Sequence, residues 1–283
     1  LRLRPKQPQL PLKILNRGSI RCRFLHPRGK ERKTCLKNSV IKPNIIKIIP
    51  KLKSISTSEW VIINNTITPY IYILFFTQNN ITYRIHKGKE HGLIVDTIPA
   101  DVKLVIAPDS SSNDYEQHKE LRDKGIDILV IDHHEADRIS ENACIINNQL
   151  CDYPTKSLSG VGVVYKFCSH LDDLLNVDYA DQFLDLVALG MVADMMDLRD
   201  FETRHLITRG LENIRNPYFK GMVDKQSYSL KDGISPIGVA FYIAPYVNAT
   251  IRMGTQEEKL ILFESMLDYR GYELIPSTKR GCK

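Results

Sequence analysis

Two short apolar runs, separated by a polar helical segment, place the strongest constraint on how this 283-residue chain can fold. The runs are "VKLVIAP" at 102–108 and "IDILVID" at 126–132, and both are typical of strands buried on both faces. Between them, residues 113–125 start at an asparagine cap and close on Gly125, as a helix does. Strand, helix and strand over this length predict a right-handed crossover in a parallel α/β sheet.

The rest of the chain divides into a sheet-forming part and a helical part. Residues 80–86 alternate apolar and polar side chains, which predicts another strand. Apolar residues at three-to-four spacing predict helices over 159–175, 179–198, 201–215 and 255–269. We expect an α/β domain over 67–200, with helices on both faces of a parallel sheet. A mainly helical connector should follow over 201–283, ending at the start of a truncated substrate-binding region.

Charge separates the first residues from the others. Residues 1–60 hold 16 Lys and Arg against Glu31 and Glu59, a net of +14, whereas the remaining 223 residues carry a net of −8. Residues 1–60 lack a sustained helical or strand period, so we expect residues 1–66 to be an irregular basic leader. Two interpretations stay open: an arm that binds nucleic-acid phosphates, or a disordered or non-native segment such as a frameshift produces.

Cysteine usage and hydropathy indicate the compartment. The six cysteines include no C-x-x-C pair and are scattered, which favours a reducing, cytoplasmic setting over a disulfide framework. The most apolar stretch, residues 69–76, is far shorter than the roughly 20 residues of a membrane span. We therefore expect no membrane association.

Acidic and imidazole side chains follow the two predicted buried strands. Asp109 comes directly after the first strand, and Asp132, His133 and His134 end the second. Because ligands of parallel α/β sheets sit outside the carboxyl ends of the strands, these groups should surround one crevice. A mixed Asp/His cluster favours Mn²⁺, Zn²⁺ or Fe²⁺. The plainer alternative is an aspartate that caps a turn beside surface histidines.

A further candidate is Asp194, which has apolar neighbours on both sides in "LVALGMVADMMDL". Burying a carboxylate without a partner is costly, so Asp194 should be neutral, hydrogen-bonded or metal-bound. Asp197 leaves a second interpretation open, in which both acids form the polar edge of a helix.

An ordered set of segments resembles the DHH phosphoesterase family, and most closely its RecJ-like single-strand nucleases. The segments are "PDSSSND" (108–114), "VIDHHEAD" (130–137), "SGVGVVYKF" (159–167), "LVALGMVADMMDL" (186–198) and "IAPYVNATIRMG" (243–254). Short phage-type homologues also carry a stretch similar to "YRIHKGKEHG" at 83–92. The resemblance runs from about residue 81 to residue 281 and implies that residues 67–200 are the DHH core.

The resemblance implies a role for each matching residue of the metal site. Asp109 would bridge two ions, Mn²⁺ or Mg²⁺, and His133 and Asp194 would be ligands of one of them. Asp132 would be a ligand or a partner that orients the imidazole. His134 would meet the scissile phosphate, which makes Asp132 and His134 the catalytic pair.

Substrate contacts are implied as well. Asn248, Arg252 and Gly254 in "NATIRMG" would hold a DNA phosphate or sugar, a task suited to a guanidinium fork. Ser159 and Gly160, at the start of a helix, would present backbone N–H groups to another phosphate.

The implied activity is hydrolysis of single-stranded DNA from 5′ to 3′ by metal-activated water, in DNA repair and recombination. The chain departs from the family at both ends. The first family motif, Asp-x-Asp followed by Gly, has no match: residues 32–95 contain Glu59 and Glu90 as their only acids. Without it one ion would lose most of its ligands. The C-terminal DHHA1 domain is not visible either.

Two alternatives follow from these departures. One is a catalytically impaired DHH-fold protein that binds nucleic acid. The other is a DHH phosphodiesterase that acts on short oligonucleotides or cyclic dinucleotides. Protein partners cannot be named from the sequence.

Overall fold

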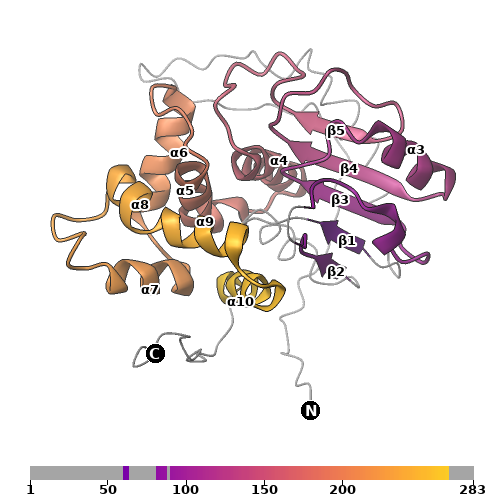
Figure 1. The fold of residues 1–283 in the computed structure, drawn as a ribbon. Coiled ribbons are helices and arrows are strands. Elements are labelled where there is room, and N and C mark those ends of the chain that lie inside the picture. Colours follow the sequence, from indigo (N-terminus) through magenta and orange to yellow (C-terminus); the bar gives the residue numbers. More distant parts are fainter. Residues whose placement is uncertain (1–59, 64–80, 88–89, 268–283) are drawn as a thin grey trace.

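The computed structural model describes residues 60–63, 81–87 and 90–267, which form a parallel sheet followed by packed helices (Figure 1). The sheet has five strands in the order β2-β1-β3-β4-β5, and every neighbouring pair is parallel. The strands are β1 (Trp60–Ile63), β2 (Ile81–Arg84), β3 (Leu104–Pro108), β4 (Asp127–Asp132) and β5 (Cys144–Asn147). The predicted α/β class is confirmed, as is the crossover from β3 through α3 (Tyr115–Asp123) to β4.

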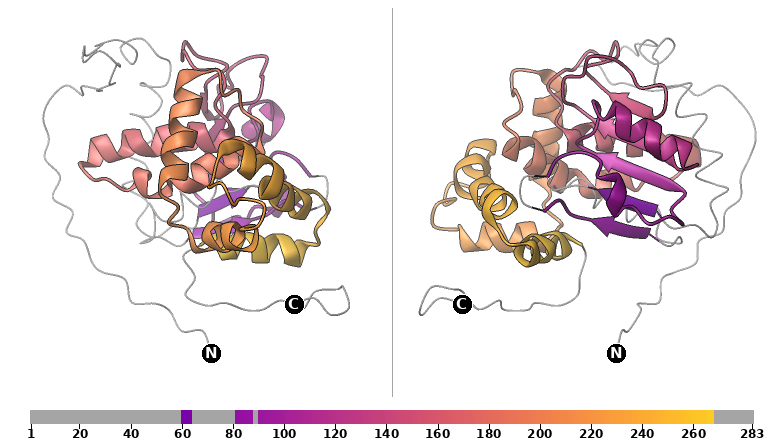
Figure 2. Two further views of the ribbon diagram at one scale, coloured as in Figure 1. Left: turned by 90° about the vertical axis from the view of Figure 1, so that its left-hand side faces the viewer. Right: turned by 45° about the vertical axis from the view of Figure 1, so that its right-hand side comes forward.

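Alternate residues of the central strands pack into two separate cores, one on each face of the sheet. Leu104 and Ile106 of β3 join a large cluster with the helices that follow the sheet. Val105 and Ala107 join a smaller cluster with Leu121 of α3. Because both faces are covered, β3 and β4 read as continuous apolar runs rather than as alternating ones. Figure 2 shows the sheet with helices on either side.

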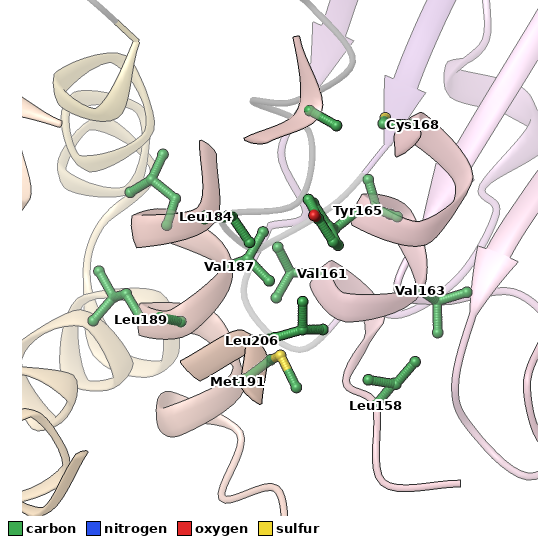
Figure 3. Packing of buried hydrophobic residues seen from close by; sticks show 14 of the residues in the cluster. Leu158, Val161, Val163, Tyr165, Cys168, Leu184, Val187, Leu189, Met191 and Leu206 are labelled. Atoms are coloured by element: carbon green, nitrogen blue, oxygen red, sulfur yellow. The ribbon is translucent and has the colours of Figure 1, made fainter. Parts of the chain in front are cut away.

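The helical part begins with α4 (Gly160–Leu175), which packs on the sheet face opposite α3. Its interior contains apolar side chains of α4, α5 and α6, such as Val161, Val187 and Leu206 (Figure 3). The further helices are η1 (Val95–Thr97), η2 (Ala180–Phe183), α5 (Leu184–Ala193), α6 (Phe201–Glu212), α7 (Pro217–Lys225), α8 (Pro236–Tyr242), α9 (Ala244–Met253) and α10 (Gln256–Met266). Among the described residues, no helix combines the length and the apolar character that crossing a membrane requires.

The structure differs from the sequence-based expectations at several elements. Strand β1 lies within residues 1–66, so the sheet begins inside the segment expected to be a basic leader. The segment 179–198 is not one helix: η2 precedes α5, and α5 ends before Met195, whose φ of 56° is left-handed. Strand β5 and helix α7 were not expected. Residues 1–59, 64–80 and 268–283, with the apolar run at 69–76, lie outside the described residues.

The strand order reverses direction between β1 and β3. Chain order places β2 on one side of β1, while β3, the strand after β2, pairs with β1 on its other side. In open α/β sheets such a reversal leaves a crevice outside the carboxyl ends of the strands. The candidate site lies at these ends.

Candidate metal centre

The carboxyl ends of β3 and β4 hold the site residues. The Asp109 backbone N–H donates to the Ile131 carbonyl at 2.7 Å and so extends the pairing of the two strands. Asp109 then adopts a left-handed φ of 59°, which is uncommon for a residue other than glycine. Such strain persists only where the surroundings hold it in place, and it gathers at functional sites.

His133 joins two carboxylates from different elements. Its Nε2 lies 3.2 Å from Oδ1 of Asp109 and 3.4 Å from Oδ2 of Asp194, the residue that ends α5. Donor atoms of Asp109, His133 and His134 also lie within 4.8 Å of one another. The structure therefore brings together four residues that the sequence singled out, from three elements of the fold.

The electrostatics of His133 and Asp194 show how these groups compete for a proton. Burial alone would lower the pKa of His133, but the hydrogen bond and charge of Asp109 outweigh it and raise this pKa. Burial, together with the nearby Asp109 charge, raises the pKa of Asp194. A proton on His133 thus balances the negative charge of Asp109 and Asp194. A divalent cation bound at this point would balance the same charge.

Asp132 is buried, and both of its carboxylate oxygens accept hydrogen bonds. It accepts from the backbone N–H groups of Ser112 (3.2 Å), His133 (2.8 Å) and His134 (3.3 Å), and it pairs with His134 Nδ1 at 2.7 Å. Burial would raise the pKa of Asp132, yet these hydrogen bonds, above all that with His134, lower it to about 2. Of the two roles expected for Asp132, the geometry favours orienting an imidazole, and the imidazole is that of His134.

His134 stands at the open side of the centre, with 60% of its side chain exposed. The hydrogen bond with Asp132 and its charge raise the pKa of His134 to about 9, so the ring is cationic at neutral pH. Because Asp132 holds Nδ1, Nε2 is the ring nitrogen left to contact a substrate. A charged donor of this kind suits an anionic phosphate.

Asp194 owes its position to the way α5 ends. Met195 N–H donates to the Val192 carbonyl and Met196 N–H to the Met191 carbonyl, a closing pattern that needs the left-handed Met195. The Asn248 side chain of α9 donates to the Ala193 carbonyl at 3.1 Å. Asn248, expected to hold DNA, therefore uses its amide to fix the helix end that carries Asp194.

The other expected substrate residues fall into different settings. Arg252 is exposed, and its charge acts on Asp194. Gly254 ends α9, where an added Cβ would overlap the Thr250 carbonyl, so its small size is needed for packing. Ser159 caps α4 and is buried, and among the described residues its hydroxyl has no hydrogen-bond partner. At Gly160 an added Cβ would overlap the Asp109 carboxylate.

The donor set fits a divalent ion. Two carboxylates that lie within 3.4 Å of one imidazole nitrogen offer the oxygen and nitrogen ligands that Mn²⁺ accepts. Ser112, whose backbone N–H donates to Asp132, was not among the residues predicted from the sequence. The serine run after Asp109 marks a turn, but nothing in it indicates which N–H group faces the carboxylate.

Comparisons with known proteins identify the family of this chain. The profile of the DHH family, N-terminal domain, matches residues 20–191. The provisionally assigned single-strand DNA-specific exonuclease YorK from the SPbeta prophage of Bacillus subtilis (strain 168) is 47% identical over 203 residues, which cover 71% of this chain and 35% of YorK. The single-stranded-DNA-specific exonuclease RecJ of the same organism is 32% identical over 180 residues, 60% of this chain and 22% of RecJ.

Solved structures show the same fold. A crystal structure of exonuclease RecJ bound to manganese superposes with a TM-score of 0.67 at 20% identity, covering 80% of this chain and 61% of that one. RecJ from Thermus thermophilus in complex with Mn²⁺ gives 0.66 at 19% identity, covering 80% and 34%. The chain spans about a third or less of the length of the curated relatives first matched. The DHH profile covers more than half of the chain and YorK is 47% identical to it, so this chain belongs to the DHH family and is RecJ-like.

Proposed function

We propose that this chain carries the metal-binding part of an enzyme that hydrolyses phosphodiester bonds of single-stranded DNA from the 5′ end. The observation that carries the proposal is the position of His133 Nε2 between the carboxylates of Asp109 and Asp194. Relatives named as single-strand DNA-specific exonucleases support the substrate class. The cytoplasm, where such DNA is processed, is the compartment that this function implies.

Each residue of the centre has a task in this proposal. Asp109, His133 and Asp194 would hold Mn²⁺ or Mg²⁺. A bound divalent ion supplies Lewis acidity toward the phosphate and lowers the pKa of water. His134, cationic and fixed by Asp132, contacts the scissile phosphate and balances the charge that develops on it. Arg252, exposed on the helix that adjoins Asp194, contacts a neighbouring phosphate.

A second candidate is a DHH-fold protein that binds single-stranded nucleic acid without cutting it. The sequence favours it at one point: residues 32–95, which include β1 and the residues after it, contain no aspartate. A site restricted to Asp109, His133 and Asp194 would hold one ion where the family holds two. Hydrolysis of short oligonucleotides or cyclic dinucleotides is the third candidate.

The test is degradation of single-stranded DNA labelled at its 5′ or 3′ end, with Mn²⁺, beside Asp109→Ala and His133→Ala. His205→Ala is the matched control, because His205 is an exposed histidine on α6. We expect the parent and the control to release mononucleotides and the two site variants to be inert. If the parent binds Mn²⁺ and single-stranded DNA but is as inert as the variants, the binding protein is the correct assignment. Cleavage of cyclic dinucleotides without cleavage of single-stranded DNA would favour the third candidate, a phosphodiesterase for small nucleotides.

A further inference from the structure

The Asp109 carboxylate packs against the first residue of α4, although 51 positions of sequence separate Asp109 from Gly160. A Cβ added to Gly160 would overlap three atoms of Asp109: Oδ1, Cγ and Cβ. The same addition at Gly162, in the same turn of the helix, would meet Leu158 at 3.3 Å and Met191 at 3.5 Å. Contacts of that length need only small adjustments, so the two glycines differ sharply in what they tolerate.

Backbone conformation does not explain the glycine at position 160. Among the described residues, the glycines with positive φ are Gly92, Gly125 and Gly233. Gly160 has a helical backbone, where alanine would be more favourable by roughly 0.5–1 kcal/mol. Space for the Asp109 side chain is therefore the reason that the structure offers for a glycine at this point.

The helix end also offers a favourable electrostatic setting for the carboxylate. α4 is 16 residues long, and its first turn contains no acidic residue. Its cap, Ser159, makes no side-chain hydrogen bond to the helix. The N-terminus of a helix carries partial positive charge, and Asp109 places a carboxylate there from another element. The α4 terminus thus faces a protein carboxylate rather than open solvent.

We propose that Gly160 is a positioning residue of the metal centre. Its missing side chain lets the Asp109 carboxylate rest on the N-terminus of α4, within reach of His133 Nε2. The contact between a phosphate and the Gly160 backbone N–H, which the family resemblance implied, stays a separate prediction. The metal-binding consequence rests on the proposed function, whereas the packing consequence does not.

The first experiment compares Gly160→Ala with Gly162→Ala by titrating Mn²⁺ calorimetrically and recording the Mn²⁺ electron paramagnetic resonance spectrum. Displacing a ligand through an outer partner weakens metal binding by about 10–100-fold, and we expect a loss of this size for Gly160→Ala. Gly162→Ala should bind Mn²⁺ like the parent, with the parent spectrum. Equal affinity in both variants and the parent would overturn the proposal.

The second experiment removes the Asp109 side chain, which a Cβ at position 160 would overlap. Asp109→Gly deletes all three overlapping atoms and also suits the left-handed φ at position 109. Thermal unfolding of a double-mutant cycle should show that Gly160→Ala lowers the melting temperature in the parent and not in the Asp109→Gly background. If Gly160→Ala cannot fold alone, folding of the double variant supports the proposal. An equal loss in both backgrounds, or a double variant that also fails to fold, overturns it.

The two experiments separate this inference from the function proposed above. If the parent itself binds neither Mn²⁺ nor Mg²⁺, the proposed function fails. The unfolding cycle still decides whether Gly160 exists to accommodate Asp109, because it needs neither metal nor DNA.

Discussion

Two side-chain clusters in this protein surround their carboxylates with different partners. On one side of α4, Glu202 of α6 pairs with Lys166 Nζ at 2.9 Å and accepts the Tyr153 hydroxyl at 2.8 and 3.0 Å. At the metal centre, Asp109 and Asp194 face the imidazole of His133 instead. The first cluster joins the loop after β5 to α4 and α6, and the second lies at the ends of β3, β4 and α5.

The difference teaches what each cluster is for. The Lys166 ammonium and the Glu202 carboxylate form an ion pair that links α4 to α6 within the protein. An imidazole gives up its proton near neutrality, and the carboxylates beside it then require another cation. We infer that the Glu202 cluster serves stability, while the His133 cluster exchanges a proton for a metal ion.

The largest expected effect is the loss of Mn²⁺ affinity on removal of the His133 imidazole. His133→Ala should weaken Mn²⁺ binding by more than about 100-fold, since loss of a ligand exceeds the 10–100-fold cost of losing an outer partner. At a pH above the raised pKa of His133 the imidazole is neutral, so its removal takes away no charge and the melting temperature should change little. Calorimetric titration and thermal unfolding check both expectations. Parent-like affinity would remove His133 from the ligand set.

Lys166→Met should give the opposite pattern. Lys166 and Glu202 are 26% and 19% exposed, so solvent screens part of their attraction. Leaving Glu202 without its cation should cost about 2 kcal/mol, below the 3–5 kcal/mol of a fully buried pair. Chemical denaturation measures this loss, and Mn²⁺ affinity should stay that of the parent. A drop in affinity comparable to that of His133→Ala would show that the two clusters are coupled.

Acidity should separate the clusters into two pH ranges. At the metal centre, the pKa of His133 is raised above 6.5 despite burial. Mn²⁺ should therefore bind fully above that pKa. Below it, the affinity for Mn²⁺ should fall by about tenfold per pH unit, because one proton must be displaced. For Glu202, burial would raise the pKa, but Lys166 and Tyr153 lower it below 4.5. Its stabilisation is present above the unfolded pKa and is lost as pH falls through the folded one.

Mn²⁺ titrations and denaturation curves recorded across the acidic range check this separation. Glu202→Gln should remove part of the acid-dependent loss of stability below pH 4.5 and leave the Mn²⁺ profile unchanged. A shift of the Mn²⁺ profile in that variant would contradict the assignment.

The smallest effect concerns strain beside the centre. Met195 is 88% exposed and has a φ of 56°, so Met195→Gly loses little buried surface and removes the cost of a left-handed side chain. We expect a gain of up to about 1 kcal/mol in the free energy of unfolding. Met196→Gly, one position beyond the left-handed turn, is the control and should destabilise. A loss in Met195→Gly would contradict the assignment of backbone strain to Met195.

The elements predicted well from the sequence were those whose apolar pattern was long and regular. The runs at 102–108 and 126–132 became β3 and β4 because both faces of these strands are buried. By contrast, "CIIN" at Cys144–Asn147 and "WVII" at Trp60–Ile63 are only four residues long. Such runs are too short for periodicity, and their partners in the sheet decide their conformation.

Site residues could be predicted where their neighbours in the sequence reveal their setting. Asp109, His133 and Asp194 stood out through strand ends and an apolar setting, and the fold brings them together. Roles that depend on distant contacts could not be read in the same way. Asn248 holds the end of α5, and Gly160 accommodates Asp109, because of packing between elements far apart in the chain.

The interior position of β1 in the sheet gives part of the basic N-terminal segment a structural role. β1 lies between β2 and β3, and it comes from residues whose composition alone suggests a dispensable leader. A chain trimmed at residue 66 would leave β2 without a neighbour and one side of β3 open. Unpaired strand edges expose rows of N–H and C=O groups that recruit other chains. Such trimming, intended to remove charge, would therefore promote self-association through the sheet.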